Sequence, residues 1–186
     1  MPKIWLTSDL HFGHDREFIF KPRGFNNVNE HDETLIENWN SVVAGSDTVY
    51  ILGDIMLNDN DKGIENFNRL NGFKYIILGN HDTSARKALY REAHNVLSVQ
   101  YATIMKYQNY SFYLSHYPTI TGNFDDESLK KCVINLFGHT HQQENFYKDI
   151  PFMYHVGVDS HNNFPVDIET IIKDCKAKVS ECKKML

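Results

Sequence analysis

Five short polar motifs constrain this chain most, because each directly follows an apolar, strand-like run. The runs cover residues 3–7, 48–52, 73–78, 110–115 and 132–137. The motifs that follow them are Asp9-x-His11, Gly53-Asp54, Gly79-Asn80-His81-Asp82, His116 and Gly138-His139-Thr140-His141. In a sheet with helical crossovers, strand ends gather along one rim, where ligands bind. We therefore expect an α/β fold in which motifs far apart in the sequence meet at one place.

Helical patterns separate the first strands. Residues 30–43 carry an apolar stripe at helical spacing, and residues 63–70 and 84–91 are shorter candidates. After Asp167, a helix N-cap, an apolar stripe from Ile168 to Cys182 predicts a last helix that packs on a sheet. Residues 101–107 and 110–115 predict a β-hairpin, and residues 152–156 a further strand. This order predicts a sheet with helices on its outside, joined by a second, more antiparallel sheet.

Composition limits the partners and the compartment. The chain has 186 residues without a linker or repeat, which predicts one domain over residues 1–186. Its formal net charge is −5 and it has no run of basic residues, so binding of nucleic acid through counterion release is disfavoured. It has three cysteines without a Cys-x-x-Cys pair, no signal peptide and no stretch of transmembrane length, so we expect a cytoplasmic protein without a membrane partner. Residues 121–131 form a polar loop for which we expect mobility.

The ligand chemistry of the motifs indicates metal-assisted hydrolysis. The motifs offer imidazole and carboxylate but no thiolate, which suits Mn²⁺, Fe²⁺, Co²⁺, Ni²⁺ or Zn²⁺, and we expect Mn²⁺. Without His81 and Asp82 seven candidate ligands remain, too many for one zinc ion with an open position. They suit two ions that share a carboxylate. Two ions about 3.5–4 Å apart can hold a water between them and clamp an in-line displacement at phosphorus.

In this order, the five motifs resemble those of the calcineurin-like metallophosphoesterase family, from about Ile4 to Val158. The resemblance implies an α/β fold of two facing mixed β-sheets flanked by helices, in four layers α/β/β/α. It also implies that His81, paired with Asp82, faces the substrate as general acid. The ligands that it implies are Asp9, His11 and His141 for the first metal, Asn80, His116 and His139 for the second, and Asp54 as the bridge between them.

Departures from the family patterns narrow the branch. Gly53-Asp54 lacks the Asp-Arg-Gly continuation of the protein Ser/Thr phosphatases. Leu57 stands where purple acid phosphatases have an iron-binding tyrosine, and His81 stands where lipid A precursor pyrophosphatases usually have arginine. The opening signature over residues 6–25, with Ser115-His116-Tyr117-Pro118 later, looks like a small prokaryotic and phage group of phosphoesterases.

The function expected is hydrolysis of a small phosphodiester or phosphomonoester, with a lean towards diesters, by attack of a hydroxide that bridges the two metals. Alternatives are a non-catalytic interaction scaffold on the same fold, or a nuclease that acts on short oligonucleotides. His14, Arg16, Lys21 and Arg23 are either substrate-binding residues or an ordinary charged loop. Arg86 has the same two interpretations, and we favour exposed helix surface for it. His31, His94 and His161 have no motif context and are assigned to the surface.

Overall fold

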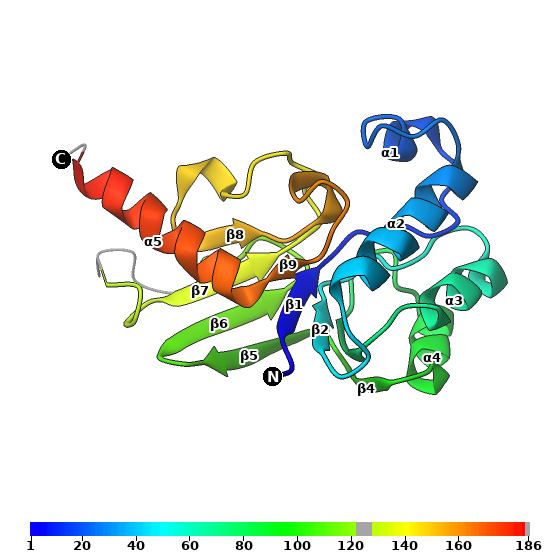
Figure 1. Ribbon diagram of the computed structural model, residues 1–186, viewed down its shortest axis with the longest axis horizontal. Helices are drawn as coiled ribbons and strands as arrows, with labels where there is room; N and C mark the ends of the chain where they lie inside the picture. The colour runs from blue at the N-terminus through cyan, green and yellow to red at the C-terminus, as the bar shows by residue number, and fades with distance from the viewer. Residues whose placement is uncertain (122–127, 185–186) are drawn as a thin grey trace.

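The computed structural model describes residues 1–121 and 128–184 and contains two mixed β-sheets with flanking helices, as expected (Figure 1). Most of the loop expected over residues 121–131 lies outside the described residues.

The first sheet has the strand order β4-β3-β2-β1-β9. Strands β1 to β4 run parallel, whereas β9 is antiparallel to β1. Strands β4 and β9 were not expected, because β4 is only partly buried and β9 has two residues, so neither produces a long apolar run. The bounds are β1 Ile4–Thr7, β2 Thr48–Ile51, β3 Phe73–Ile77, β4 Val96–Gln100 and β9 Val166–Asp167.

Three crossover helices lie on the same side of this sheet in Figure 1, as the sequence predicts. They are α2 Val28–Val42, α3 Asn60–Asn68 and α4 Ser84–Glu92. Each begins after a residue whose side chain accepts a hydrogen bond from the first turn: Asn27, Asp59 and Thr83. Their apolar side chains form one buried cluster with the sheet, with Trp39 among the largest fully buried residues.

The second sheet has the order β5-β6-β7-β8, and its hairpin of β5 and β6 confirms the prediction. The sheet is mixed, because β6 pairs with β7 and β7 with β8 in parallel. Among the described strands it is also the more antiparallel sheet, as expected, with one antiparallel strand pair in three against one in four in the first sheet. Long connections precede β7 and β8, and connections of that length allow parallel pairing. The bounds are β5 Ala102–Tyr107, β6 Tyr110–Ser115, β7 Val133–Phe137 and β8 Met153–His155.

A second apolar cluster fills the space that the two sheets share. Leu6 and Leu52 reach it from the first sheet, and Leu114 and Leu136 from the second. The last helix, α5 Ile168–Lys184, adds its apolar stripe, which confirms that this helix packs on a sheet. Two single turns, η1 Tyr147–Asp149 and η2 Val158–Ser160, and the short helix α1 Glu17–Phe20 complete the structure. Among the described helices, none has the length and apolar content needed to span a bilayer.

Candidate metal centre

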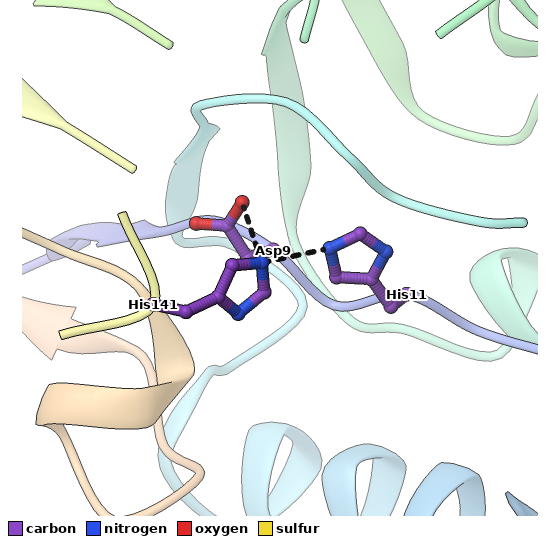
Figure 2. A group of neighbouring side chains, drawn as sticks. All are labelled: Asp9, His11 and His141. Atoms are coloured by element: carbon purple, nitrogen blue, oxygen red, sulfur yellow. Dashed lines mark hydrogen bonds and ion pairs between the residues drawn. The ribbon is translucent and has the colours of Figure 1, made fainter. Parts of the chain in front are cut away.

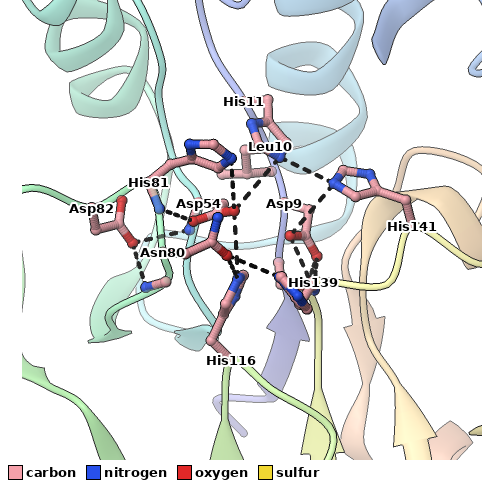
Figure 3. Close-up of polar contacts among 12 residues, drawn as sticks. Asp9, Leu10, His11, Asp54, Asn80, His81, Asp82, His116, His139 and His141 are labelled. Atoms are coloured by element: carbon pink, nitrogen blue, oxygen red, sulfur yellow. Dashed lines mark hydrogen bonds and ion pairs between the residues drawn. The ribbon is translucent and has the colours of Figure 1, made fainter. Parts of the chain in front are cut away.

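All seven predicted ligands lie together at the rim formed by the ends of five strands (Figure 3). The loops that carry them follow β1, β2, β3, β6 and β7. The carboxylates and imidazoles of the rim form two groups of potential metal ligands. Within each group, the ligand atoms all lie within 4.8 Å of one another. These groups are Asp9, His11 and His141, and Asp9, Asp54 and His116.

The backbone of the rim is held in a conformation that non-glycine residues rarely adopt. Five of the seven predicted ligands have φ between 49° and 68°. Each such residue costs about 1–3 kcal/mol, and strain of this kind clusters at functional sites. The five residues are Asp9, His11, Asp54, His139 and His141.

Glycines allow the loops of the rim to approach each other. A Cβ atom on Gly53 would lie 2.6 Å from both the Gly79 backbone nitrogen and His116 Nδ1. A Cβ on Gly79 would collide with the Asp54 carboxylate. The Gly-Asp and Gly-Asn-His-Asp motifs therefore need glycine because the loops after β2, β3 and β6 meet there.

The first group combines one carboxylate with two imidazoles (Figure 2). His11 Nε2 and His141 Nε2 are 3.3 Å apart, and His141 Nε2 is 4.0 Å from Asp9 Oδ1. The other ring nitrogen of His141, Nδ1, is 3.0 Å from Asp159 Oδ2. When Nδ1 carries the proton and donates it to this carboxylate, the Nε2 lone pair points at the other ligands.

The predicted ligands His116 and His139 lie next to Asn80. Its Oδ1 lies 2.8 Å from His116 Nε2 and 2.9 Å from His139 Nδ1. His116 Nδ1 is 2.7 Å from the Leu52 carbonyl oxygen, which fixes the proton on Nδ1 when that nitrogen donates. Asp54 lies between His116 and His11, because its Oδ2 is 3.4 Å from His116 Nε2 and 3.9 Å from His11 Nε2.

The donor set fits divalent cations. In the tautomers that Asp159 and Leu52 favour, the Nε2 lone pairs of His141 and His116 face other acceptors, and such a convergence is repulsive until a cation occupies it. Protons compete for the same place. Burial acts to lower the pKa of His116, but its hydrogen bond to Asp54 and the charges of Asp9 and Asp54 outweigh burial and raise the pKa to about 8. Burial acts to raise the pKa of Asp54, but the His116 side chain above all lowers it to about 2.

Arg23 is buried and is not part of the lining of the cavity beside the ligands, where a substrate-binding residue would lie. Its side chain is 1% exposed, and it is paired with Asp159, which is 5% exposed. Arg23 Nε donates to Asp159 Oδ1 and its second terminal nitrogen to Asp159 Oδ2, both at 2.9 Å, and the latter also donates to the Asp9 carbonyl. The guanidinium therefore fixes the carboxylate that orients His141. His31, which was assigned to the surface, is buried and lies 2.9 Å from the guanidinium.

Of the remaining basic residues of this loop, Arg16 and Lys21 are exposed, whereas His14 lies beside the predicted ligands. Arg16 is exposed at the start of α1, and Lys21 is exposed and paired with Glu17. His14 is buried and lines the cavity beside the ligands, as a substrate-binding residue would. Burial, followed by the charges of His81 and Arg16, lowers the pKa of His14 to about 4, so its imidazole is neutral at pH 7.

Asp82 is not paired with the His81 imidazole, contrary to expectation. Its Oδ2 accepts hydrogen bonds from the backbone N–H of Gly79 and Asp54, at 2.8 and 2.9 Å, and its Oδ1 accepts from the Tyr90 hydroxyl. Three donors hold the carboxylate inside the protein, where it braces the loops after β2 and β3.

His81 precedes Asp82 in the same loop, and Arg86 lies in α4. The side chain of His81 is 41% exposed, with Nε2 4.0 Å from Asp54 Oδ2. The backbone N–H of His81 donates to Asp54 Oδ1 at 2.9 Å, which fixes the loop that carries the imidazole. Arg86, assigned to the surface, is buried and donates to the His81 carbonyl and to Asn60 Oδ1.

A cavity of about 490 Å³ opens onto the predicted ligands. Its lining divides into the polar groups of the rim and an apolar side from the loop after β1 and from Leu57. The lining residues are His11, His14, Phe18, Ile19, Pro22, Asp54, Leu57, Asn80, His81, His139, His141, Gln143 and Asp159.

Two mixed sheets with imidazole and carboxylate groups at one rim define a metallophosphoesterase fold. The match with the calcineurin-like phosphoesterase superfamily domain, over residues 3–171, agrees with this class. The chain belongs to the calcineurin-like phosphoesterase superfamily.

Similar proteins share nearly the full length of the chain. An uncharacterised protein of Methanocaldococcus jannaschii is 35% identical over 183 residues, which cover 93% of this chain and 91% of that protein. The gene 66 protein of Mycobacterium phage L5 is 30% identical and covers 86% of this chain and 88% of its own. A protein of unknown function from Aquifex aeolicus has a similar fold, with a TM-score of 0.72 at 22% identity over 93% of this chain and 99% of its own.

Proposed function

We propose that this protein is a two-metal phosphoesterase that hydrolyses a small phosphate ester, with a preference for phosphodiesters. The observation that carries the proposal is the convergence of the seven predicted nitrogen and oxygen ligands at one rim, where Asp54 Oδ2 lies within ion-pair distance of both His11 and His116. Membership of a phosphoesterase superfamily supports a hydrolase. His81, on the same rim, favours an enzyme over a non-catalytic scaffold.

In this proposal, Asp9, His11 and His141 would hold one ion, and Asn80, His116 and His139 would hold the other. Asp54 would be shared, because its Oδ2 lies 3.9 Å from His11 Nε2 and 3.4 Å from His116 Nε2. Bound ions would supply Lewis-acid activation of water and neutralisation of charge on the phosphate. Mn²⁺ is the ion expected, and the same ligand types also suit Fe²⁺, Zn²⁺, Co²⁺ and Ni²⁺.

His81 is the proposed proton donor to the leaving oxygen. Its imidazole is partly exposed in the cavity, and its ring centroid lies 5.6 Å from that of His11, edge to face. An alkoxide leaving group is strongly basic and needs a proton as the P–O bond breaks, and a positioned general acid contributes about 10²–10⁴-fold to such a step. The backbone bond to Asp54 holds His81 beside the proposed ions.

The charge of the cavity supports the preference for diesters. Among the described residues that line it, none is lysine or arginine. Arg23 lies behind the ligands, where Asp159 balances its charge. A phosphodiester carries one negative charge near pH 7, whereas a phosphomonoester carries nearly two. The cavity therefore offers no protein cation for the second charge of a monoester.

The test is hydrolysis after removal and return of metal. The metal-stripped protein is loaded with Mn²⁺ and assayed with bis(p-nitrophenyl) phosphate, p-nitrophenyl phosphate and a dinucleotide. We expect turnover that depends on the metal, with a higher kcat/KM for the diester than for the monoester. Absence of hydrolysis of every substrate, with Mn²⁺ and with Fe²⁺, Zn²⁺, Co²⁺ or Ni²⁺ loaded in its place, would contradict the proposal.

A further inference from the structure

One side of the cavity is apolar and contains none of the predicted ligands. We call Phe18, Ile19, Pro22 and Leu57 the apolar wall. Three of them come from the loop and short helix after β1, and Leu57 follows the bridging carboxylate motif. A wall of this kind contributes nothing to metal binding, so its chemistry concerns the remainder of the substrate.

Phe18 is the exposed aromatic residue of the wall. Its neighbours in α1, Ile19 and Phe20, are buried, whereas Phe18 is 70% exposed at the mouth of the cavity. Its ring meets the His14 ring edge to face, with the centroids 5.6 Å apart and the planes at 90°. An exposed aromatic ring beside a binding cavity offers a face on which a planar group can stack.

His14 links the wall to the rim, because its ring contacts Phe18 and its centroid lies 5.3 Å from that of His11 and 6.5 Å from that of His81. A group that leaves on the oxygen protonated by His81 would extend past His14 to Phe18. The substituent of the leaving oxygen is therefore the part of the substrate that meets the wall.

From this arrangement we infer that the substrate carries an uncharged planar ring, an aryl group or a nucleobase, on its leaving oxygen, and that Phe18 stacks on this ring. The inference rests on the proposed function and specifies its substrate class. It also excludes a polyphosphate substituent, because the described lining offers no lysine or arginine and nearby Lys21 is paired with Glu17.

Binding of phosphonates tests the inference without any need for turnover, because carbon replaces the bridging oxygen in them. The Mn²⁺-loaded protein is titrated calorimetrically with benzylphosphonate, with cyclohexylmethylphosphonate, which has as many carbons but no planar ring, and with ethylphosphonate. The 5′-phosphonates of adenosine and of ribose without a base form a second pair, which distinguishes a nucleobase from an aryl group. The variants are Phe18→Leu, which stays apolar without a flat face, and Phe18→Trp. The control is Tyr101→Leu, at an aromatic residue of similar exposure, 73%, that is not part of the cavity lining.

We expect Phe18→Leu to weaken binding of benzylphosphonate or of the adenosine phosphonate about tenfold, as loss of one stacked ring does. The non-aromatic partner of each pair should change less than about twofold, Phe18→Trp should retain binding, and Tyr101→Leu should have no effect. Equal effects of Phe18→Leu on planar and non-planar ligands, or no effect on either, would overturn the inference. Failure of the wild-type protein to hydrolyse any ester would refute the proposed function, whereas selective loss of the planar ligands would still support the ring site.

Discussion

The Arg23–Asp159 pair predicts how a residue that is not a ligand controls one of the two proposed ions. In Asp159→Asn, the amide keeps the volume of the carboxylate but loses its charge. The amide oxygen can still accept a hydrogen bond from Arg23 Nε. The NH₂ group takes the place of Oδ2, so it faces the terminal nitrogen of Arg23 and His141 Nδ1, which both lie within hydrogen-bond distance of Oδ2 in the wild-type protein. His141 then gains by placing its proton on Nε2, the nitrogen that faces His11.

The structure sets two magnitudes for this variant. Breaking a buried pair by removing one charge costs about 3–5 kcal/mol, and we expect the lower end because one of the two bonds to Arg23 survives. Loss of the carboxylate that orients a metal-binding histidine weakens metal binding about 10–100-fold. The ion at Asp9, His11 and His141 should show this loss, while the ion at Asn80 and His116 should stay within about twofold of wild type.

The assay is calorimetric titration of the metal-stripped protein with Mn²⁺, with thermal melting in parallel. Asp174→Asn is the matched control, because Asp174 accepts a hydrogen bond from the Tyr154 hydroxyl away from the rim. A double variant, Arg23→Met with Asp159→Leu, removes both charges and should recover part of the stability but none of the metal affinity. Unchanged affinity at both ions in Asp159→Asn, or equal loss at both, would refute the role assigned to this pair.

Three further predictions concern His81, Asp82 and Lys74. His81→Gln should slow hydrolysis of an alkyl or nucleoside ester about 10²–10⁴-fold and that of a nitrophenyl ester far less, with metal content unchanged; equal losses measured on both substrates would exclude the general-acid role. Asp82→Asn should lower the free energy of unfolding by about 1–3 kcal/mol in urea titrations. It should leave unchanged the ratio of turnover between alkyl and nitrophenyl esters, which reports the role of His81, and a change in that ratio would restore a direct pairing. Burial lowers the pKa of Lys74 from 10.5 to about 8. The unfolded chain therefore binds more protons between these pH values, so stability should rise from pH 8 to 10.5, by about 3 kcal/mol at most, and this rise should be absent in Lys74→Met.

The rim was predictable because each ligand motif follows its own apolar strand. Parallel strands bring their carboxyl ends to one edge, so position after a strand was sufficient to bring Asp9, Asp54 and Asn80 together. Strands without a strong apolar run, β4 and β9, had no such signal. The direction in which β7 and β8 pair was not predicted, because a strand pattern does not show whether its connection returns the chain in parallel.

The residues that hydrogen-bond to the predicted ligands and hold them in place were harder to predict. A basic residue in a loop gives no sign that it will be buried, and Arg23 depends on a carboxylate 136 residues later in the chain. Asp159 did have a signal, because Gly157-Val158-Asp159 follows β8 much as Gly53-Asp54 follows β2. Asp82 was paired with His81 on adjacency alone, although neighbouring side chains in an extended or turning loop often point apart. Its true partners belong to the loops after β2 and β3 and to α4.

The count of metal ions tests the central claim most directly. Metal-stripped wild-type protein and Asp54→Asn are titrated with Mn²⁺, and bound metal and hydrolysis of bis(p-nitrophenyl) phosphate are followed together. A carboxylate shared by both ions predicts two ions per wild-type chain, activity that appears as the second ion binds, and weaker binding of both ions in Asp54→Asn. One ion per active chain, or an Asp54→Asn protein that loses one ion and holds the other with unchanged affinity, would contradict the account.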